Sequence, residues 1–169
     1  MPGKNPLYYW DTCLFLAWIK DEERESGEMA GVREAVERVS RRDARIITSV
    51  ITQIEVLSSH IPVGMDDLLK KLMRRIEQVS VDIKVAGLAH DVRDHYARAG
   101  GKTVSTPDSI HFATAILYRA NEFHTFDQKG SSRSLGLLPL FGNFGGHKLI
   151  ICKPEAKQPQ LDLKKPPIK

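Results

Sequence analysis

Apolar positions along the chain fall into short continuous runs that alternate with stretches of helical spacing. The short runs, which are typical of buried strands, cover residues 7–10, 45–49, 79–81, 122–127 and 148–152. Helical spacing covers about 12–19, 28–42, 50–58, 66–76, 82–99 and 106–120. Strands that alternate with helices predict an α/β fold, with a parallel sheet covered by helices on both faces.

Local signals mark the ends of the two longest helical stretches in the second half of the chain. Asp82 is a suitable cap for the first of them, and Gly100-Gly101 is a stop signal. The second begins at Ser105-Thr106-Pro107-Asp108, where we expect Thr106 to be the cap and Pro107 to hold the first helical position. Asp108 then lies at the positive end of the helix, which favours an acid.

Four carboxylates are predicted to approach one edge of the sheet. Asp11 ends the first strand, Asp127 ends the fourth, and Asp108 lies in the helix just before the fourth strand. Right-handed crossovers bring the carboxyl ends of parallel strands to the same edge, which is where ligands bind in such sheets. Glu55 follows the second strand, and its apolar neighbours Ile51, Ile54 and Leu57 predict a largely buried helix.

Converging carboxylates restrict the chemistry of such an edge. Two unit charges about 4 Å apart repel by about 4 kcal/mol at an effective dielectric of 20, so the acids would bind protons or a cation. Oxygen ligands without a cysteine cluster favour Mg²⁺ or Mn²⁺, which can activate water and neutralise a phosphodiester. Thr12, Thr106 and Thr125 are hydroxyl residues beside these acids that could orient water bound to the metal.

Four short motifs resemble the acidic motifs of the PIN-domain ribonucleases, in the same order and with similar spacing. They are Tyr8-Tyr9-Trp10-Asp11-Thr12, Ile51-Thr52-Gln53-Ile54-Glu55-Val56-Leu57, Thr106-Pro107-Asp108-Ser109-Ile110-His111-Phe112-Ala113-Thr114-Ala115 and Thr125-Phe126-Asp127. Each motif is weak alone, and the resemblance spans about residues 7–152.

This resemblance implies a three-layer α/β/α fold with a central, mostly parallel sheet. It implies an endoribonuclease that depends on Mg²⁺ or Mn²⁺, with Asp11, Glu55, Asp108 and Asp127 as catalytic and metal-binding residues. Many small members are VapC-type toxins of type II toxin–antitoxin pairs. The implied partners are therefore an RNA substrate, a cognate antitoxin protein and a second copy of the chain in a homodimer.

The chain departs from the family pattern after the last motif. Many members carry a further acid there, whereas Lys129, Gly130, Ser131, Ser132 and Arg133 follow Asp127 in this sequence. The fourth ligand therefore rests on Asp127 alone, and the number of metal ions stays open. Lys129 and Arg133 are candidate phosphate contacts on the same edge.

Composition adds boundaries to this interpretation. The 169 residues suit one nuclease domain at 1–152, followed by a basic, proline-containing tail at 153–169 with the composition of a disordered segment. The net charge of +4 is compatible with a polyanionic partner. Cys13 and Cys152 lack metal-type spacing and are expected to be buried, reduced thiols. We see no signal peptide and no membrane-spanning run, which makes the cytoplasm the expected location.

The sequence leaves alternatives to a ribonuclease. A PIN-like domain could bind RNA or a protein without cutting, although a non-catalytic domain has no need to tolerate four facing acids. A DNA-directed or flap-type nuclease finds little support in so short a chain. His90-Asp91 resembles one element of the HD phosphohydrolases, but the strands argue against that helical fold. His111 shares a helix face with Asp108, where it could touch metal or phosphate, but we expect it to be a polar residue at the rim of the core.

Overall fold

A parallel five-stranded sheet forms the centre of the molecule, whose computed structural model describes residues 5–24, 27–140, 142–144 and 147–156. The strand order is β3-β2-β1-β4-β7, and every neighbouring pair is parallel. The strands are β1 (Leu7–Trp10), β2 (Arg45–Ser49), β3 (Glu77–Val79), β4 (Glu122–His124) and β7 (Ile151–Cys152). The predicted α/β fold with a mostly parallel central sheet is confirmed.

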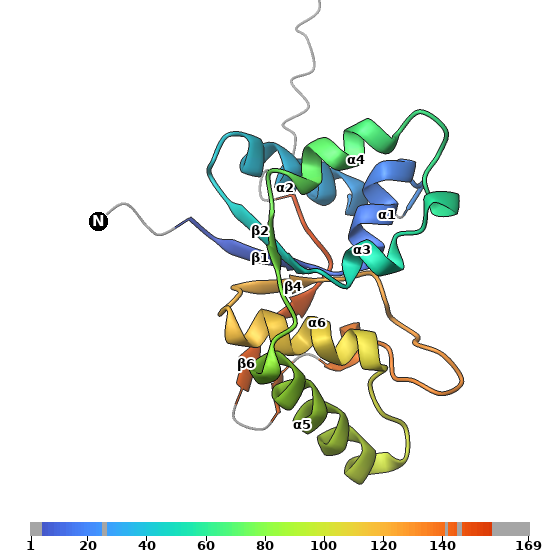
Figure 1. Cartoon of the computed structure of the whole chain (residues 1–169), viewed down its shortest axis with the longest axis vertical. Helices are drawn as coiled ribbons and strands as arrows, with labels where there is room; N and C mark the ends of the chain where they lie inside the picture. The colour runs from blue at the N-terminus through green and yellow to red at the C-terminus, as the bar shows by residue number, and fades with distance from the viewer. Residues whose placement is uncertain (1–4, 25–26, 141, 145–146, 157–169) are drawn as a thin grey trace, which may run out of the picture.

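Helices cover both faces of this sheet (Figure 1). One face packs against α1 (Thr12–Lys20), α2 (Glu28–Ser40) and α4 (Asp66–Met73). The other packs against α5 (Ile83–Gly100) and α6 (Thr106–Leu117). The helices that precede and follow β3, α4 and α5, therefore lie on opposite sides of the sheet.

The central strand β1 divides the core between these two faces. Because successive side chains point to opposite faces, Tyr8 and Trp10 pack with α1 and α2, whereas Tyr9 packs with α6. Tyr9 and Trp10 have no exposed surface, and Tyr9 stacks on Phe123 of β4 with ring centroids 5.0 Å apart. The aromatic run is buried, as the sequence predicted, and it fixes the strand that Asp11 ends.

The prediction of one helix over residues 50–58 is wrong. The structure has only α3 (Thr52–Glu55) and a 3-10 turn, η1 (Ser58–His60), at this place. Ile54 is 73% exposed and Leu57 is 53% exposed, so the expected burial is also wrong. No side chain caps α3, and apolar spacing alone cannot tell a covered helix face from an uncovered one.

Several boundaries differ from the predicted ones. β3 covers Glu77–Val79 rather than 79–81, and β4 ends at His124, so Asp127 lies in the loop beyond it. The single strand expected at 148–152 is two strands, because β6 (His147–Leu149) pairs antiparallel with β5 (Gly142–Phe144) before β7 joins the main sheet. The segment between β4 and β5 contains a 3-10 turn, η2 (Leu138–Leu140).

The segment after β7 lies across α2. Lys153 pairs with Glu28, and the carbonyl of Pro154 lies where a β-carbon on Gly31 would stand. The greater part of the predicted tail, 157–169, lies outside the described residues. None of the helices in the described part of the chain has the length and apolarity needed to cross a membrane.

Candidate functional site

Asp11 is both a helix cap and a buried acid at the sheet edge. Its Oδ1 accepts hydrogen bonds from the backbone N–H groups of Cys13 (3.1 Å) and Leu14 (3.4 Å) at the start of α1. Its Oδ2 accepts the hydroxyl hydrogen of Thr125 at 2.5 Å. Burial raises the pKa of Asp11 even though these donors lower it. The same carboxylate thus caps α1 and lies buried among the groups at the edge of the sheet.

Asp108 faces two other acids from the first turn of α6. Ser105, rather than Thr106, is the N-cap, and its Oγ accepts the Asp108 N–H at 3.2 Å. The Ser105 hydroxyl also bonds the Asp108 carboxylate. Burial, together with the charges of Asp11 and Asp127, raises the pKa of Asp108 to about 6. The structure therefore brings these three predicted residues into one electrostatic neighbourhood.

Glu55 joins the site through the end of α3. Its Oε2 accepts hydrogen bonds from the Thr12 hydroxyl and from His111 Nε2, the latter at 2.8 Å. Burial opposes the charge on Glu55, but the hydrogen bonds from His111 and Thr12 outweigh it, so the pKa of Glu55 is lowered. Unlike Asp108, Glu55 is held as a carboxylate by its own donors.

Asp127 is tied to the loop that follows β4. Its N–H donates to Thr125 Oγ1 (3.0 Å), and its Oδ1 accepts the N–H of Gly130 (2.9 Å). The buried Thr125 hydroxyl thus bridges Asp11 and Asp127, and the half-buried Thr12 hydroxyl bonds Glu55. Two of the three threonines expected to orient metal-bound water, Thr12 and Thr125, thus serve as direct partners of the acids, whereas the third, Thr106, is exposed.

Cations approach this edge from two segments. Lys129 and Arg133 are exposed on the loop after Asp127, as the sequence suggested. Arg24 was not predicted as a site residue. Its guanidinium lies 4.0 Å from the ring centroid of Phe126, the residue before Asp127. Arg24 also pairs with Glu22 at 2.6 Å. No local sequence signal identifies Arg24, because its neighbour comes from a segment about a hundred residues later.

The donor set fits a hard divalent cation. Four carboxylates supply the oxygen ligands that Mg²⁺ and Mn²⁺ prefer. Within the described residues, no three of these four acids bring ligand atoms within 4.8 Å of one another. A cation that retains several of its waters suits such an open arrangement, and Mg²⁺ characteristically does so.

Comparison with known proteins agrees with this architecture. A family model described as the PIN domain matches residues 8–132, nearly three quarters of the chain. The chain belongs to the PIN-domain family. None of the curated proteins compared with it matches.

Solved structures share the PIN fold at low sequence identity. VapBC2 from Rickettsia felis, bound to a DNA fragment from its promoter, has a TM-score of 0.55 and 14% identity, covering 86% of this chain and 96% of that chain. A toxin–antitoxin complex from Klebsiella pneumoniae has a TM-score of 0.53 and 19% identity, covering 72% and 88%. VapC20 from Mycobacterium tuberculosis, a sarcin–ricin loop cleaving toxin, has a TM-score of 0.50 and 12% identity, covering 72% and 90%. These likenesses show the fold.

Two residues of this PIN domain have a closer relation to the acids than the sequence indicated. His111 is only 1% exposed and bonds Glu55 directly, so it is not a rim residue. The thiol of Cys13 donates to Asp11 Oδ1 at 2.8 Å, and burial raises its pKa well above the ordinary value. In the described part of the chain neither Cys13 nor Cys152 forms a disulfide, and both are half-buried. The contact of Cys13 with Asp11 could have been predicted from their separation of two residues at a helix start. The contact of His111 with Glu55 could not, because the two residues are far apart in the sequence.

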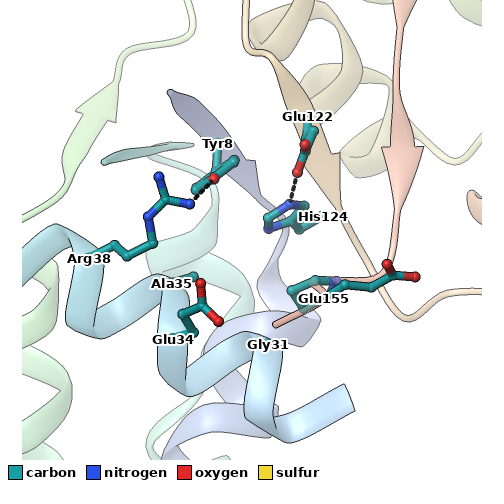
Figure 2. A pocket seen from close by; sticks show the side chains of 9 residues that line it. Tyr8, Gly31, Glu34, Ala35, Arg38, Glu122, His124 and Glu155 are labelled. Atoms are coloured by element: carbon teal, nitrogen blue, oxygen red, sulfur yellow. Dashed lines mark hydrogen bonds and ion pairs between the residues drawn. The ribbon is translucent and has the colours of Figure 1, made fainter. Parts of the chain in front are cut away.

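A second group of metal-type side chains lies beside α2, on the face of the sheet that α1 and α2 cover. In the described part of the chain, Glu122, His124 and Cys152 place three ligand atoms within 4.8 Å of one another. Glu122 and His124 border a cavity of about 20 Å³ beside α2, where Figure 2 shows their side chains meeting. A cavity of this size has room for about one water molecule.

Hydrogen bonds already use both ring nitrogens of His124. Trp10 Nε1–H donates to Nδ1 at 3.1 Å, and Nε2 meets Glu122 Oε2 at 2.8 Å. Because an indole N–H only donates, Nδ1 accepts and Nε2 carries the hydrogen. His124 then has no lone pair left for a cation, and we assign no metal to this group.

Proposed function

We propose that this PIN-domain protein is a divalent-cation-dependent endoribonuclease. The observation that supports this most is the meeting of Asp11, Asp108 and Asp127 at the carboxyl edge of the sheet, where burial, with smaller contributions from the charges of Asp11 and Asp127, raises the pKa of Asp108 to about 6. Burying an acid beside two other acids is costly for a domain that only folds, and a bound cation offsets this cost. Glu55, held ionised beside them, completes the acidic set.

The four acids would hold Mg²⁺ or Mn²⁺, directly or through water. When bound, the cation would supply an activated water and charge neutralisation on the phosphodiester. The chain's own groups orient these ligands, with Thr125 on Asp11, Thr12 on Glu55 and Ser105 on Asp108. Arg24, Lys129 and Arg133 would attract the RNA backbone, a contribution that falls as salt rises.

Cleavage of RNA by the purified full chain tests this proposal. Wild-type protein should cut RNA with Mg²⁺ or Mn²⁺ and lose the activity in EDTA. Asp11→Asn and Asp108→Asn should each reduce the rate by at least about 100-fold, a size typical of lost electrostatic stabilisation at a reacting phosphate. Asp67→Asn is the matched control, because Asp67 lies on the exposed surface of α4. Equal rates for wild type and Asp11→Asn would refute the nuclease.

The same assay separates the nuclease from a PIN-like domain that binds RNA or protein without cutting. A binding module would retain RNA on a filter or gel in all variants, produce no fragments, and show no dependence on the four acids. Fragments that disappear in both Asn variants would rule out that alternative.

We further propose that the chain is the toxin of a type II pair, with an antitoxin protein as partner and a homodimer as its own assembly. The fold shared with toxin–antitoxin structures supports this. Expression in a bacterial host should stop growth, whereas Asp11→Asn should not. The product of a neighbouring small reading frame should restore growth and co-purify with the chain. Light scattering on the purified chain should give twice the mass of 19.0 kDa.

A further inference from the structure

His111 lies at the junction of the acidic site and the core. It comes from α6, three residues after Asp108, and its side chain is almost wholly buried. Its two ring nitrogens face different parts of the molecule: Nε2 lies 2.8 Å from Glu55 Oε2, and Nδ1 lies 2.6 Å from Tyr9 Oη. The ring therefore connects the central strand β1 to an acid at the edge of the sheet.

Hydrogen-bond donors fix the order of this connection. The backbone N–H of Ser49 donates to Tyr9 Oη at 3.0 Å, so the phenol oxygen is already an acceptor. The phenol hydrogen is then directed at His111 Nδ1, and the short separation of 2.6 Å suits an O–H donor. With Nδ1 accepting, the ring hydrogen is on Nε2 and is donated to Glu55.

Glu55 needs such support from outside its own helix. α3 is a single turn with no side-chain cap, and Ile54 beside Glu55 is 73% exposed. Packing of α3 therefore does little to fix the direction of the Glu55 side chain. In the described structure both donors, Thr12 and His111, bond the same oxygen, Oε2. Among the described residues Oε1 has no hydrogen-bond partner, so it is the oxygen that would be available to a cation.

We propose that Tyr9 and His111 act as positioning residues that orient Glu55 as a cation ligand. This inference rests on the proposed function, because Glu55 needs a fixed direction only if it binds the cation. Tyr9 sets which nitrogen of His111 carries the hydrogen, and His111 then holds Glu55 Oε2. Both side chains are buried, Tyr9 with 0% and His111 with 1% of its surface exposed, so they would act through Glu55 rather than on the substrate. Partners that orient metal ligands in this way typically change metal affinity or activity by 10–100-fold when they are mutated.

Calorimetric titration of the full chain with Mn²⁺, without RNA, tests this role. His111→Leu should weaken Mn²⁺ binding by about 10-fold or more. His111→Gln, whose amide N–H can still reach Glu55, should recover most of the affinity. Tyr9→Phe, which removes only the hydroxyl, should weaken binding and change the ¹⁵N shifts of His111 from those of the Nε2–H form. In cleavage assays, the loss should appear in kcat at limiting Mn²⁺, with KM for RNA unchanged.

The chain offers matched controls for both substitutions. His124 is a similarly buried histidine, with the same 2.8 Å contact to a glutamate, but it lies on the opposite face of the sheet. His124→Leu should leave Mn²⁺ binding at the four acids unchanged, and so should Tyr118→Phe at an exposed tyrosine. A loss in His124→Leu as large as that in His111→Leu would assign the effect to general destabilisation and overturn the inference.

The outcomes also separate this inference from the proposed function. If Mn²⁺ does not bind wild type, or binds Asp108→Asn equally well, both the nuclease and the positioning role fail. A different result separates the two proposals: Asp108→Asn loses Mn²⁺ binding, but Tyr9→Phe, His111→Gln and His111→Leu all bind Mn²⁺ as wild type does. In that case only the positioning role fails. Should His111→Leu not fold, Tyr9→Phe and its ¹⁵N signature decide the question alone.

Discussion

Asp108 serves two purposes whose electrostatic demands conflict. At the first turn of α6 its negative charge complements the helix dipole, and the Ser105 cap donates to it. Toward the site, the charges of Asp11 and Asp127 and the loss of water work against ionisation. The second influence is larger, since the pKa of Asp108 rises from 3.8 to about 6. Without a cation, Asp108 thus reduces the stability of the folded chain at neutral pH.

The sign of this effect gives a prediction for Asp108→Asn. A folded state that holds the proton more tightly loses stability as pH rises from about 4 to about 6, and above pH 6 the whole cost, about 3 kcal/mol, is present. Asn resembles the protonated acid. At pH 7.5 in EDTA, the free energy of unfolding of the variant should therefore exceed that of wild type by up to about 3 kcal/mol. At pH 4 the two should be nearly equal. Urea denaturation at both pH values measures this, and equal stability at pH 7.5 would contradict it.

Residue-scale signals in the sequence predicted the structural positions of Asp11 and Asp108, because those signals are local. Asp11 follows an apolar run and caps a helix, and Asp108 follows Pro107 in a helix start. The cap itself was misplaced by one residue, from Ser105 to Thr106, because both types of side chain cap helices well. The partner of Glu55 was not predictable, since His111 is distant in sequence and only the packed fold brings the two side chains together.

At the scale of elements, α2 is fixed by its contact with the segment after β7. A β-carbon on Gly31 would lie 2.1 Å from the carbonyl oxygen and 2.4 Å from the carbonyl carbon of Pro154. Both are backbone atoms, which cannot swing aside as the end of a flexible side chain can. Gly31 is therefore required for close approach, although glycine weakens a helix.

Gly31→Ala should consequently destabilise the protein. The usual gain of about 0.5–1 kcal/mol for Ala in a helix is outweighed by overpacking, which costs about 1–3 kcal/mol. Gly87→Ala in α5 is the control, because nothing lies within 4 Å of the added carbon, and it should stabilise by about 0.5–1 kcal/mol. Thermal melts of both variants compare them directly. A Gly31→Ala protein as stable as wild type would show that the segment after β7 does not pack there.

Elements whose apolar residues are buried against the rest of the fold were predicted well, and those whose apolar residues are exposed were not. β1, β2, α2 and α5 agree closely with their patterns because buried faces impose regular spacing. The stretch at 50–58 has the same spacing, but Ile54 and Leu57 are exposed and only one helical turn forms. The pairing of β6 with β5 depends on a neighbour that the pattern of residues 148–152 alone does not reveal.

At the scale of the whole molecule, the sheet brings acids from four separate segments to one edge. The parallel order β2-β1-β4 places the strand ends next to one another, so Asp11 lies between Glu55 from beyond β2 and Asp127 from beyond β4. The family's motif order made this edge predictable. How far apart the acids stay was not predictable, because it depends on the loops and on α3.

A cation that binds across this edge should stabilise the entire fold. Binding to the folded state alone contributes about 2.7 kcal/mol at 100 times the Kd, which for a chain of this length is a rise in Tm of about 5–10 °C. The rise with Mg²⁺ or Mn²⁺ should be larger at pH 7.5 than at pH 5, because below its pKa of about 6 Asp108 holds a proton that the cation must displace. Asp11→Asn and Asp108→Asn should lose most of the response, while the exposed Asp67→Asn should keep it. Scanning calorimetry with and without EDTA measures it, and a response that both site variants retain in full would place the cation elsewhere on the molecule.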